Sequence, residues 1–229
     1  WGEASTTSAE VGSNIRLWSQ DNLGQDLIFN VYDGAPYYWN KVLGLGARAT
    51  TFASQATASD APTITRRMMT AYRGRYIVCF GCNEVGETDQ NLLHVRWSDL
   101  EDPFNFTVAS GSDACFLTIS SGSEIISAKK PRSEMLIWTD TALHSMTWNE
   151  TDIFAINMVA NNVSIIGPNA TVAVGDKVFW MDRENFYVYT GRVQVVPCTL
   201  LRYVFDDINL DQSFKCFAAS NKMFDEVFW

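Results

Sequence analysis

The sequence predicts an all-β protein, built as a β-propeller of four-stranded antiparallel blades. Short apolar runs alternate with polar turns along the chain, and the periodicity of an amphipathic helix is scarce. Aromatic residues make up 13% of the 229 residues, a composition that favours strands. The apolar runs also pair into hairpins at a recurring spacing, which indicates a repeated unit.

Five hairpins are expected along the chain, each made of two apolar runs joined by a polar turn: residues 27–31 with 36–39, 76–80 with 92–97, 135–138 with 142–146, 178–181 with 186–189, and 217–219 with 223–229. In the fourth, Asp182-Arg183-Glu184-Asn185 separates Val178–Met181 from Phe186–Tyr189, the pattern of a strand, a short loop and a returning strand.

The spacing of these hairpins matches the blade of a propeller. Their turns are centred near residues 33, 87, 140, 183 and 221, so successive turns lie roughly 38 to 54 residues apart. Further strands are expected between the hairpins, at residues 116–119, 124–128, 170–174 and 193–196. A two-sheet sandwich also contains regular hairpins and is the competing architecture. The aromatic repeat favours a propeller of which this chain covers about four to five blades.

The predicted organisation is an N-terminal extension over residues 1–14 and a partial propeller over residues 15–229. The segment at about 47–62 is poor in charge and rich in Ala, Ser and Thr, so we expect a linker between blades. Residues 204–213 are expected to form a short helix or a loop. The chain begins at Trp1 and ends in an apolar run, so we expect a piece of a longer polypeptide, with a ring closed by further sequence or other chains.

The charge balance argues against tight, sequence-specific DNA binding. The chain has 17 Lys and Arg against 26 Asp and Glu, a net charge of −9, whereas DNA affinity comes mostly from cations that displace counterions. Two basic clusters are expected at subunit contacts or in solvated loops: Arg66, Arg67, Arg73 and Arg75, and Lys129, Lys130 and Arg132. No run reaches the ~18 apolar residues of a membrane span. The low charged fraction, 19%, predicts that part of the surface is covered by other subunits.

The five cysteines, Cys79, Cys82, Cys115, Cys198 and Cys216, suggest neither a disulfide framework nor a metal site. Cys79-Phe80-Gly81-Cys82 has the spacing of half a zinc site, but no second pair supplies the other two ligands. We expect reduced cysteines in the core. Phosphate-binding loops and alternating-Asp calcium loops are also missing from the sequence, so no cofactor is predicted.

Candidate catalytic groups are few, and each has a simpler interpretation. His94, Ser98 and Asp99 could form a triad on paper, but no nucleophile elbow accompanies them, and His144 is likewise expected in ordinary strand packing. A glycosidase would need two converging carboxyl groups. The candidates for that pair lie in two clusters that are typical of turns and loops: Asp99, Glu101 and Asp102, and Asp206, Asp207 and Asp211. No catalytic, cofactor-binding or metal-binding residue is predicted.

Several segments together resemble one protein family. They are residues 17–28 (LWSQDNLGQDLI), 94–99 (HVRWSD), 137–143 (IWTDTAL), 186–189 with 191–193 (FYVY and GRV), and 203–209 (YVFDDIN). In order and spacing they are similar to the tail-tube (nozzle) structural proteins of short-tailed bacteriophages, related to tail tubular protein B and the packaged-DNA stabilisation proteins. The similarity runs from about residue 15 to the end of the chain.

The resemblance implies a non-enzymatic virion protein, assembled in the bacterial host cytoplasm. Its copies would form a ring, usually a hexamer, beneath the portal and adaptor, and the ring would retain the packaged genome and conduct it during ejection. An acidic lumen would repel the duplex and let it slide. Two alternatives remain open: another virion component, such as an adaptor, a receptor-binding tail protein or a capsid-associated protein, and a propeller hydrolase that acts on host polysaccharide.

Overall fold

The computed structural model describes residues 15–71, 75–132 and 134–229. Its strands form four four-stranded antiparallel sheets and one two-stranded sheet. Blade 1 contains β1 (Trp18–Leu23), β2 (Asp26–Val31), β3 (Pro36–Trp39) and β4 (Thr50–Thr51); blade 2 contains β5 (Thr65–Ala71), β6 (Tyr76–Cys82), β7 (His94–Trp97) and β8 (Cys115–Thr118); blade 3 contains β9 (Ile125–Lys129), β10 (Glu134–Thr139), β11 (Ala142–Asn149) and β12 (Ile153–Asn161); blade 4 contains β13 (Thr171–Val174), β14 (Lys177–Met181), β15 (Phe186–Tyr189) and β16 (Val193–Val195); the two-stranded sheet contains β17 (Ala219–Asn221) and β18 (Glu226–Phe228).

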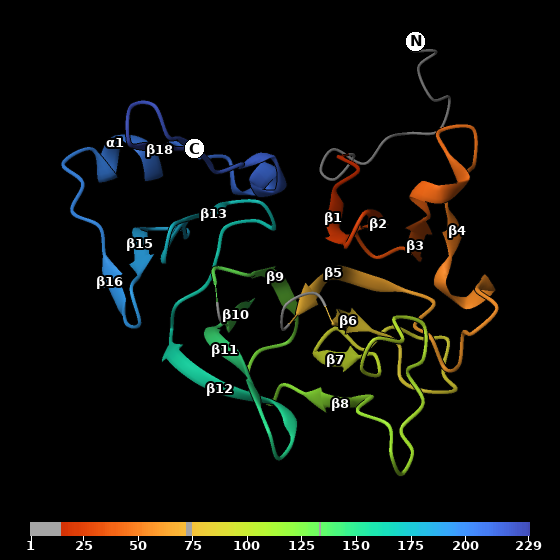
Figure 1. Ribbon diagram of the computed structural model, residues 1–229. Helices are drawn as coiled ribbons and strands as arrows, with labels where there is room; N and C mark the ends of the chain where they lie inside the picture. Colours follow the sequence, from red (N-terminus) through yellow and green to blue (C-terminus); the bar gives the residue numbers. More distant parts are fainter. Residues whose placement is uncertain (1–14, 72–74, 133) are drawn as a thin grey trace, which may run out of the picture.

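The four blades are arranged around a common axis (Figure 1). Within each blade the strands pair in sequence order, so each blade is a simple meander. The first strands of the blades lie innermost, where β5 contacts both β1 and β9, and β13 contacts both β9 and β17. The last strands, β4, β8, β12 and β16, lie at the rim (Figure 1). The predicted propeller is confirmed.

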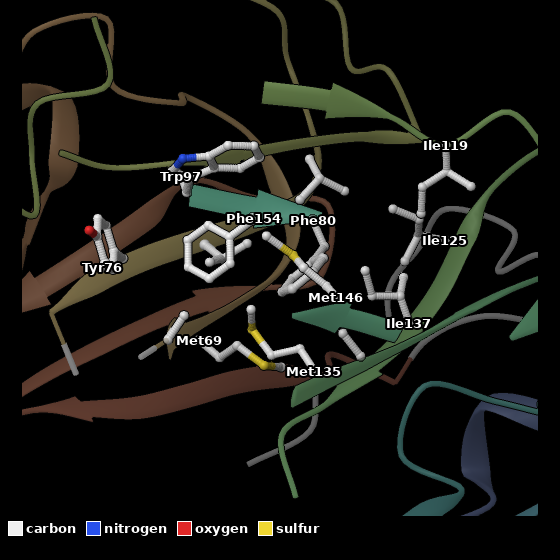
Figure 2. Packing of buried hydrophobic residues seen from close by; sticks show 14 residues of the cluster. Met69, Tyr76, Phe80, Trp97, Ile119, Ile125, Met135, Ile137, Met146 and Phe154 are labelled. Atoms are coloured by element: carbon white, nitrogen blue, oxygen red, sulfur yellow. The ribbon is translucent and has the colours of Figure 1, made fainter. Parts of the chain in front are cut away.

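Apolar side chains fill the interfaces between successive blades. Alternation along β6 explains how: Ile77 and Cys79 face blade 1, whereas Val78 and Phe80 face blade 3. The interface between blades 2 and 3 is the largest of these clusters, and Figure 2 shows Trp97 and Phe154 meeting in it, with ring centroids 5.3 Å apart. Burial of each large side chain contributes about 1.5–3 kcal/mol, so the blades are held chiefly by contact with their neighbours.

Blades 3 and 4 meet through a pair of tryptophans. Trp138 of β10 and Trp180 of β14 occupy equivalent places in their blades, are fully buried, and pack edge to face with centroids 5.4 Å apart. The indole Nε1 of Trp180 also donates a hydrogen bond to Ser164 O (3.0 Å). The aromatic residues that mark the hairpins in the sequence therefore form the contacts between blades.

The predicted hairpins correspond to observed strand pairs. The turns near residues 33, 87, 140 and 183 each join the second and third strands of a blade, so they mark equivalent points of the repeat. The turn near residue 221 differs, because it joins β17 and β18, the first and second strands of their sheet. This change of position explains why the last step along the sequence is the shortest.

Other segments differ from the sequence-based expectation. Residues 47–62 are only partly a linker: they include β4 and the 3-10 helix η2 (Phe52–Ser54), and Phe52 is fully buried between blades 1 and 2. In place of one short helix at 204–213 the chain has α1 (Leu201–Phe205) and the 3-10 helix η3 (Leu210–Lys215). The predicted N-terminal extension, residues 1–14, lies outside the described residues. None of the described helices is long and apolar enough to cross a bilayer.

Candidate functional site

The innermost strands carry a network of charged side chains around the propeller axis. Arg66 of β5 lies at its centre and is 8% exposed. Its Nε donates to Asp33 of blade 1 (3.0 Å), and its Nη1 donates to Glu124 (2.6 Å) and to the backbone oxygen of Ile125 (2.9 Å) in blade 3. One guanidinium from blade 2 therefore holds both neighbouring blades, as its fixed fork of donors permits.

Arg67 extends the network toward blade 4. Its Nη1 donates to Ser127 Oγ of β9 (3.1 Å) and to Pro168 O (2.8 Å), in the loop that leads into β13. Ser127 Oγ in turn donates to the same Pro168 oxygen (2.6 Å). Because Arg67 belongs to blade 2 and Pro168 precedes blade 4, this contact links two blades that are not consecutive in the chain. Burial lowers the pKa of Arg67 to about 10, so the side chain stays charged at neutral pH.

Lys130 forms a second junction, between blades 1, 2 and 3. Its Nζ donates to Asp21 Oδ2 of β1 (2.9 Å) and to the backbone and hydroxyl oxygens of Thr70 in β5 (2.7 and 2.8 Å). Thr70 returns a hydrogen bond from its hydroxyl to the same Asp21 oxygen (2.8 Å). Burial alone would raise the pKa of Asp21, but the hydrogen bonds from Lys130 and Thr70 outweigh it and hold the pKa below its ordinary value.

These contacts correct the prediction for the two basic clusters. Arg66 and Arg67 lie on β5 and Lys130 directly follows β9, and all three join blades within the chain instead of lying in solvated loops. Arg75 and Arg132 do lie at the surface, in exposed ion pairs with Glu101 and Asp176. Arg73 lies outside the described residues. Arg66, Arg67 and Lys130 therefore join blades, whereas Arg75 and Arg132 lie at the surface.

A cavity of about 510 Å³ opens beside this network, between blade 1 and η3. Tyr32 and Phe214 form part of its wall, with their rings edge to face and their centroids 5.5 Å apart. The Arg66 guanidinium lies 5.1 Å from the centre of the Tyr32 ring, and burial raises the pKa of that phenol strongly. The one buried cation of this cavity is already paired with Asp33 and Glu124, so it is not free to bind a ligand.

The triad that His94, Ser98 and Asp99 could have formed is not assembled. His94 Nδ1 pairs with Thr118 Oγ1 (2.8 Å), and burial lowers the pKa of the imidazole. Ser98 Oγ donates to the backbone oxygen of Asp99 (3.1 Å). The Asp99 carboxylate accepts from backbone N–H groups, including that of Asp113 (2.8 Å), and so closes a turn as the sequence indicated.

The other carboxyl groups do not converge either. Glu101 is exposed and pairs with Arg75, while Asp102 accepts from the backbone N–H of Phe104 (3.4 Å). Asp206, Asp207 and Asp211 are exposed: the first two follow α1, and Asp211 lies in η3. Blade 2 carries the first cluster, and the segment after blade 4 carries the second. The two clusters belong to different parts of the fold and form no paired carboxyl site.

One contact between a hydroxyl and an imidazole, that of Ser121 with His144, is not predicted from the sequence. His144 Nε2 lies 2.8 Å from Ser121 Oγ, and burial lowers the pKa of His144, which leaves the imidazole neutral. The nearby carboxylate, Asp140, points elsewhere: it accepts from the backbone N–H and the hydroxyl of Ser123 (both 2.7 Å). Gly122, with φ of +91°, lies between Ser121 and Ser123 in the chain. These residues together hold the loop between β8 and β9, and Asp140 does not orient His144 as the acid of a catalytic triad would.

The cysteines have the predicted reduced state. All five are free, and Cys79 and Cys82 are buried between blades 1 and 2. Burial raises the pKa of the Cys79 thiol to about 12, which suppresses the reactive thiolate. Within the described residues no three His, Cys, Asp or Glu side chains gather as metal ligands.

The most exposed of the large apolar side chains lie on two parts of the surface. One is the loop between β3 and β4, with Val42, Leu43 and Leu45. The other is the segment 200–229, in which the most exposed are Tyr203, Met223 and Phe224. Monomeric proteins seldom leave so many apolar side chains in water, so these surfaces suit contact with another molecule.

Comparison with known proteins adds no assignment: no protein-family model and no curated protein matches this chain.

Proposed function

We propose that this chain is a non-catalytic structural subunit of a bacteriophage tail. It forms part of the nozzle that retains the packaged genome and conducts DNA during ejection. The observation that carries the proposal is the role of the cations on the inner strands: Arg66, Arg67 and Lys130 all join blades. The proposed position of the protein in the tail rests on the resemblance of the five sequence segments to tail-nozzle proteins.

The contacts between inner strands also bear on where DNA would pass. The first strands of successive blades contact one another, and Arg67 of blade 2 bonds to Pro168 before blade 4, so we do not place the duplex inside one propeller. The conduit is instead the hole of a ring made of several copies, expected to be six. The apolar surface of residues 200–229 supports contact between copies, because buried interfaces need apolar area. The net charge of −9 suits a lumen that does not adsorb its cargo.

The function is tested in the phage whose genome encodes this chain. Particles assembled without the protein are expected to package DNA and then lose it, measured as DNA accessible to added nuclease. Supplying the protein in trans restores nuclease resistance. Particles that lack the protein and still retain protected DNA would overturn the proposal, as would its absence from purified tails.

A polysaccharide hydrolase is the alternative of a different class. The contact between Ser121 and His144 is the one feature that a hydrolase could use. The purified protein is expected to release no sugar from host cell-wall or capsule material. Turnover that is lost in Ser121→Ala, or in Asp99→Asn with Asp206→Asn, would favour the hydrolase and reject the structural role.

A further inference from the structure

The loop between β3 and β4 has an apolar tip that the fold leaves in water. Val42, Leu43 and Leu45 are 90%, 68% and 95% exposed. The loop lies at the periphery of blade 1, away from the axis (Figure 1). Phe52, only seven residues beyond Leu45, is fully buried, so the chain returns to the core directly after the tip. The exposed apolar side chains are therefore confined to the tip of the loop, and the blade beneath it is well packed.

The loop is largely preformed, because several of its backbone polar groups bond within it. The hydrogen bonds are Val42 N–H to Asn40 Oδ1 (2.8 Å), Leu43 N–H to Asn40 O (3.2 Å), Gly44 N–H to Lys41 O (3.0 Å), Ala47 N–H to Gly44 O (3.2 Å) and Trp39 Nε1–H to Ala47 O (3.1 Å). Gly44 has φ of +73°, a conformation that glycine adopts without strain. A segment can enter an apolar medium only if its polar backbone groups are paired in this way.

Basic residues flank the tip. Lys41 and Arg48 are both exposed, and Lys41 Nζ bonds to the neutral amide oxygen of Gln25 (2.6 Å). The carboxylate beneath, Asp26, is engaged by the backbone N–H of Lys41 (2.9 Å) and by the hydroxyl of Tyr38 (2.6 Å). Cations beside an apolar tip suit the boundary between lipid headgroups and acyl chains, where anionic headgroups attract them.

We infer that the tip, residues 42–45, inserts into the interfacial region of a lipid bilayer, with Lys41 and Arg48 against anionic headgroups. A protein interface is the less suitable occupant, because a stable one buries about 800 Å² per partner, more than three side chains on a narrow tip provide. A bilayer needs no complementary shape. The inference goes beyond the proposed function and stands independently of it, since it concerns what the rim of blade 1 touches.

Flotation of the purified protein with lipid vesicles tests the inference. The probes are vesicles of phosphatidylcholine alone and of phosphatidylcholine mixed with phosphatidylglycerol. The tip variant carries Val42→Ser, Leu43→Ser and Leu45→Ser. The matched control carries Val108→Ser, Met158→Ser and Val195→Ser, three exposed apolar residues outside both the tip and the 200–229 surface. Because all six side chains are exposed, both variants are expected to fold, which circular dichroism checks.

The protein is expected to float with the vesicles, and more strongly with those that contain phosphatidylglycerol. The tip variant loses about tenfold or more in vesicle partitioning, since all its inserting apolar area is removed. The control stays within about twofold of the unchanged protein. Lys41→Gln with Arg48→Gln weakens binding several-fold on the anionic vesicles only.

Three outcomes would overturn the inference. The unchanged protein fails to float, the tip variant floats as well as the control, or the tip variant changes the oligomeric state in solution and leaves flotation unchanged. The last result would make the loop a contact between proteins. Loss of vesicle binding with intact genome retention in particles would separate this inference from the proposed function.

Discussion

Arg66 of β5 and Glu124, at the entry to β9, form an ion pair in which Nη1 lies 2.6 Å from Oε2. The pair joins blade 2 to blade 3 near the axis, and the same guanidinium holds Asp33 of blade 1 through Nε. A side chain at this position links three consecutive blades, so its removal affects the whole ring of contacts.

Arg66→Met is expected to destabilise the fold by about 2 kcal/mol, because three hydrogen bonds from a charged group are lost and two carboxylates are left unpaired. The cost stays moderate since Asp33 and Glu124 are each more than a third exposed. The control is Arg75→Met, which breaks the exposed pair with Glu101 and should change stability by less than about 0.5 kcal/mol. Denaturant unfolding measures both; equal effects would contradict a structural role for the axial pair.

Stability should fall in acid through Asp21. The folded-state pKa of Asp21 lies below its ordinary value of 3.8, so its contribution is complete above about pH 5 and is lost as the pH falls through the folded pKa. Asp21→Asn removes this contribution and flattens the pH dependence between about pH 5 and pH 2. Lys130→Met should raise the pKa of Asp21 toward that of an unpaired carboxyl. Unfolding measured across this range checks both, and an unchanged slope in Asp21→Asn would contradict the assignment.

Gly122→Ala should destabilise the loop between blades 2 and 3. A Cβ at this position would collide with Asp140 Oδ1 and lie 2.9 Å from Thr139 Oγ1, at a φ of +91°. We expect a loss of about 2–3 kcal/mol, because overpacking adds to the backbone strain. Gly86→Ala is the control: its φ is +80° and nothing lies within 4 Å, so only the strain of about 1 kcal/mol remains. Thermal unfolding of the two variants should separate them.

The cysteines should differ sharply in reactivity. In the native protein a thiol reagent is expected to label Cys115, Cys198 and Cys216, which are partly exposed, before Cys79 and Cys82, which are buried. Unfolding in denaturant should make all five reactive. Mass spectrometry of the labelled peptides identifies the order. Rapid native labelling of Cys79 or Cys82 would mean that blades 1 and 2 separate readily.

The sequence predicts the middle of each blade better than its inner edge. Strands such as Val178–Met181 and Met135–Trp138 are apolar on both faces, because they are packed between two blades, and their apolar runs are easily recognised. The innermost strands β9 and β13 are predicted, but β1 and β5 are not, since Asp21, Arg66 and Arg67 give these two segments a polar composition. The long outer strand β12 is also missed, because its exposed rim face breaks the apolar pattern.

The contacts at the candidate site could not be predicted from the sequence, because they join residues that are far apart in the chain. A cluster such as Arg66-Arg67 is visible in the sequence, but its partners Asp33, Glu124 and Pro168 lie 33 to 101 residues away. Only the closure of blades around an axis brings them together. The pairing of Ser121 with His144 is hidden for the same reason, since it joins a loop to a strand of the next blade.

Imaging of the phage particle by cryo-electron microscopy is the decisive experiment for the proposed function. We expect a ring of propellers at the distal end of the tail, each with Arg67 bonded to Pro168, and a DNA path that runs through the hole between copies. Density for this chain elsewhere in the particle, or a duplex threaded through the axis of a single propeller, would contradict it.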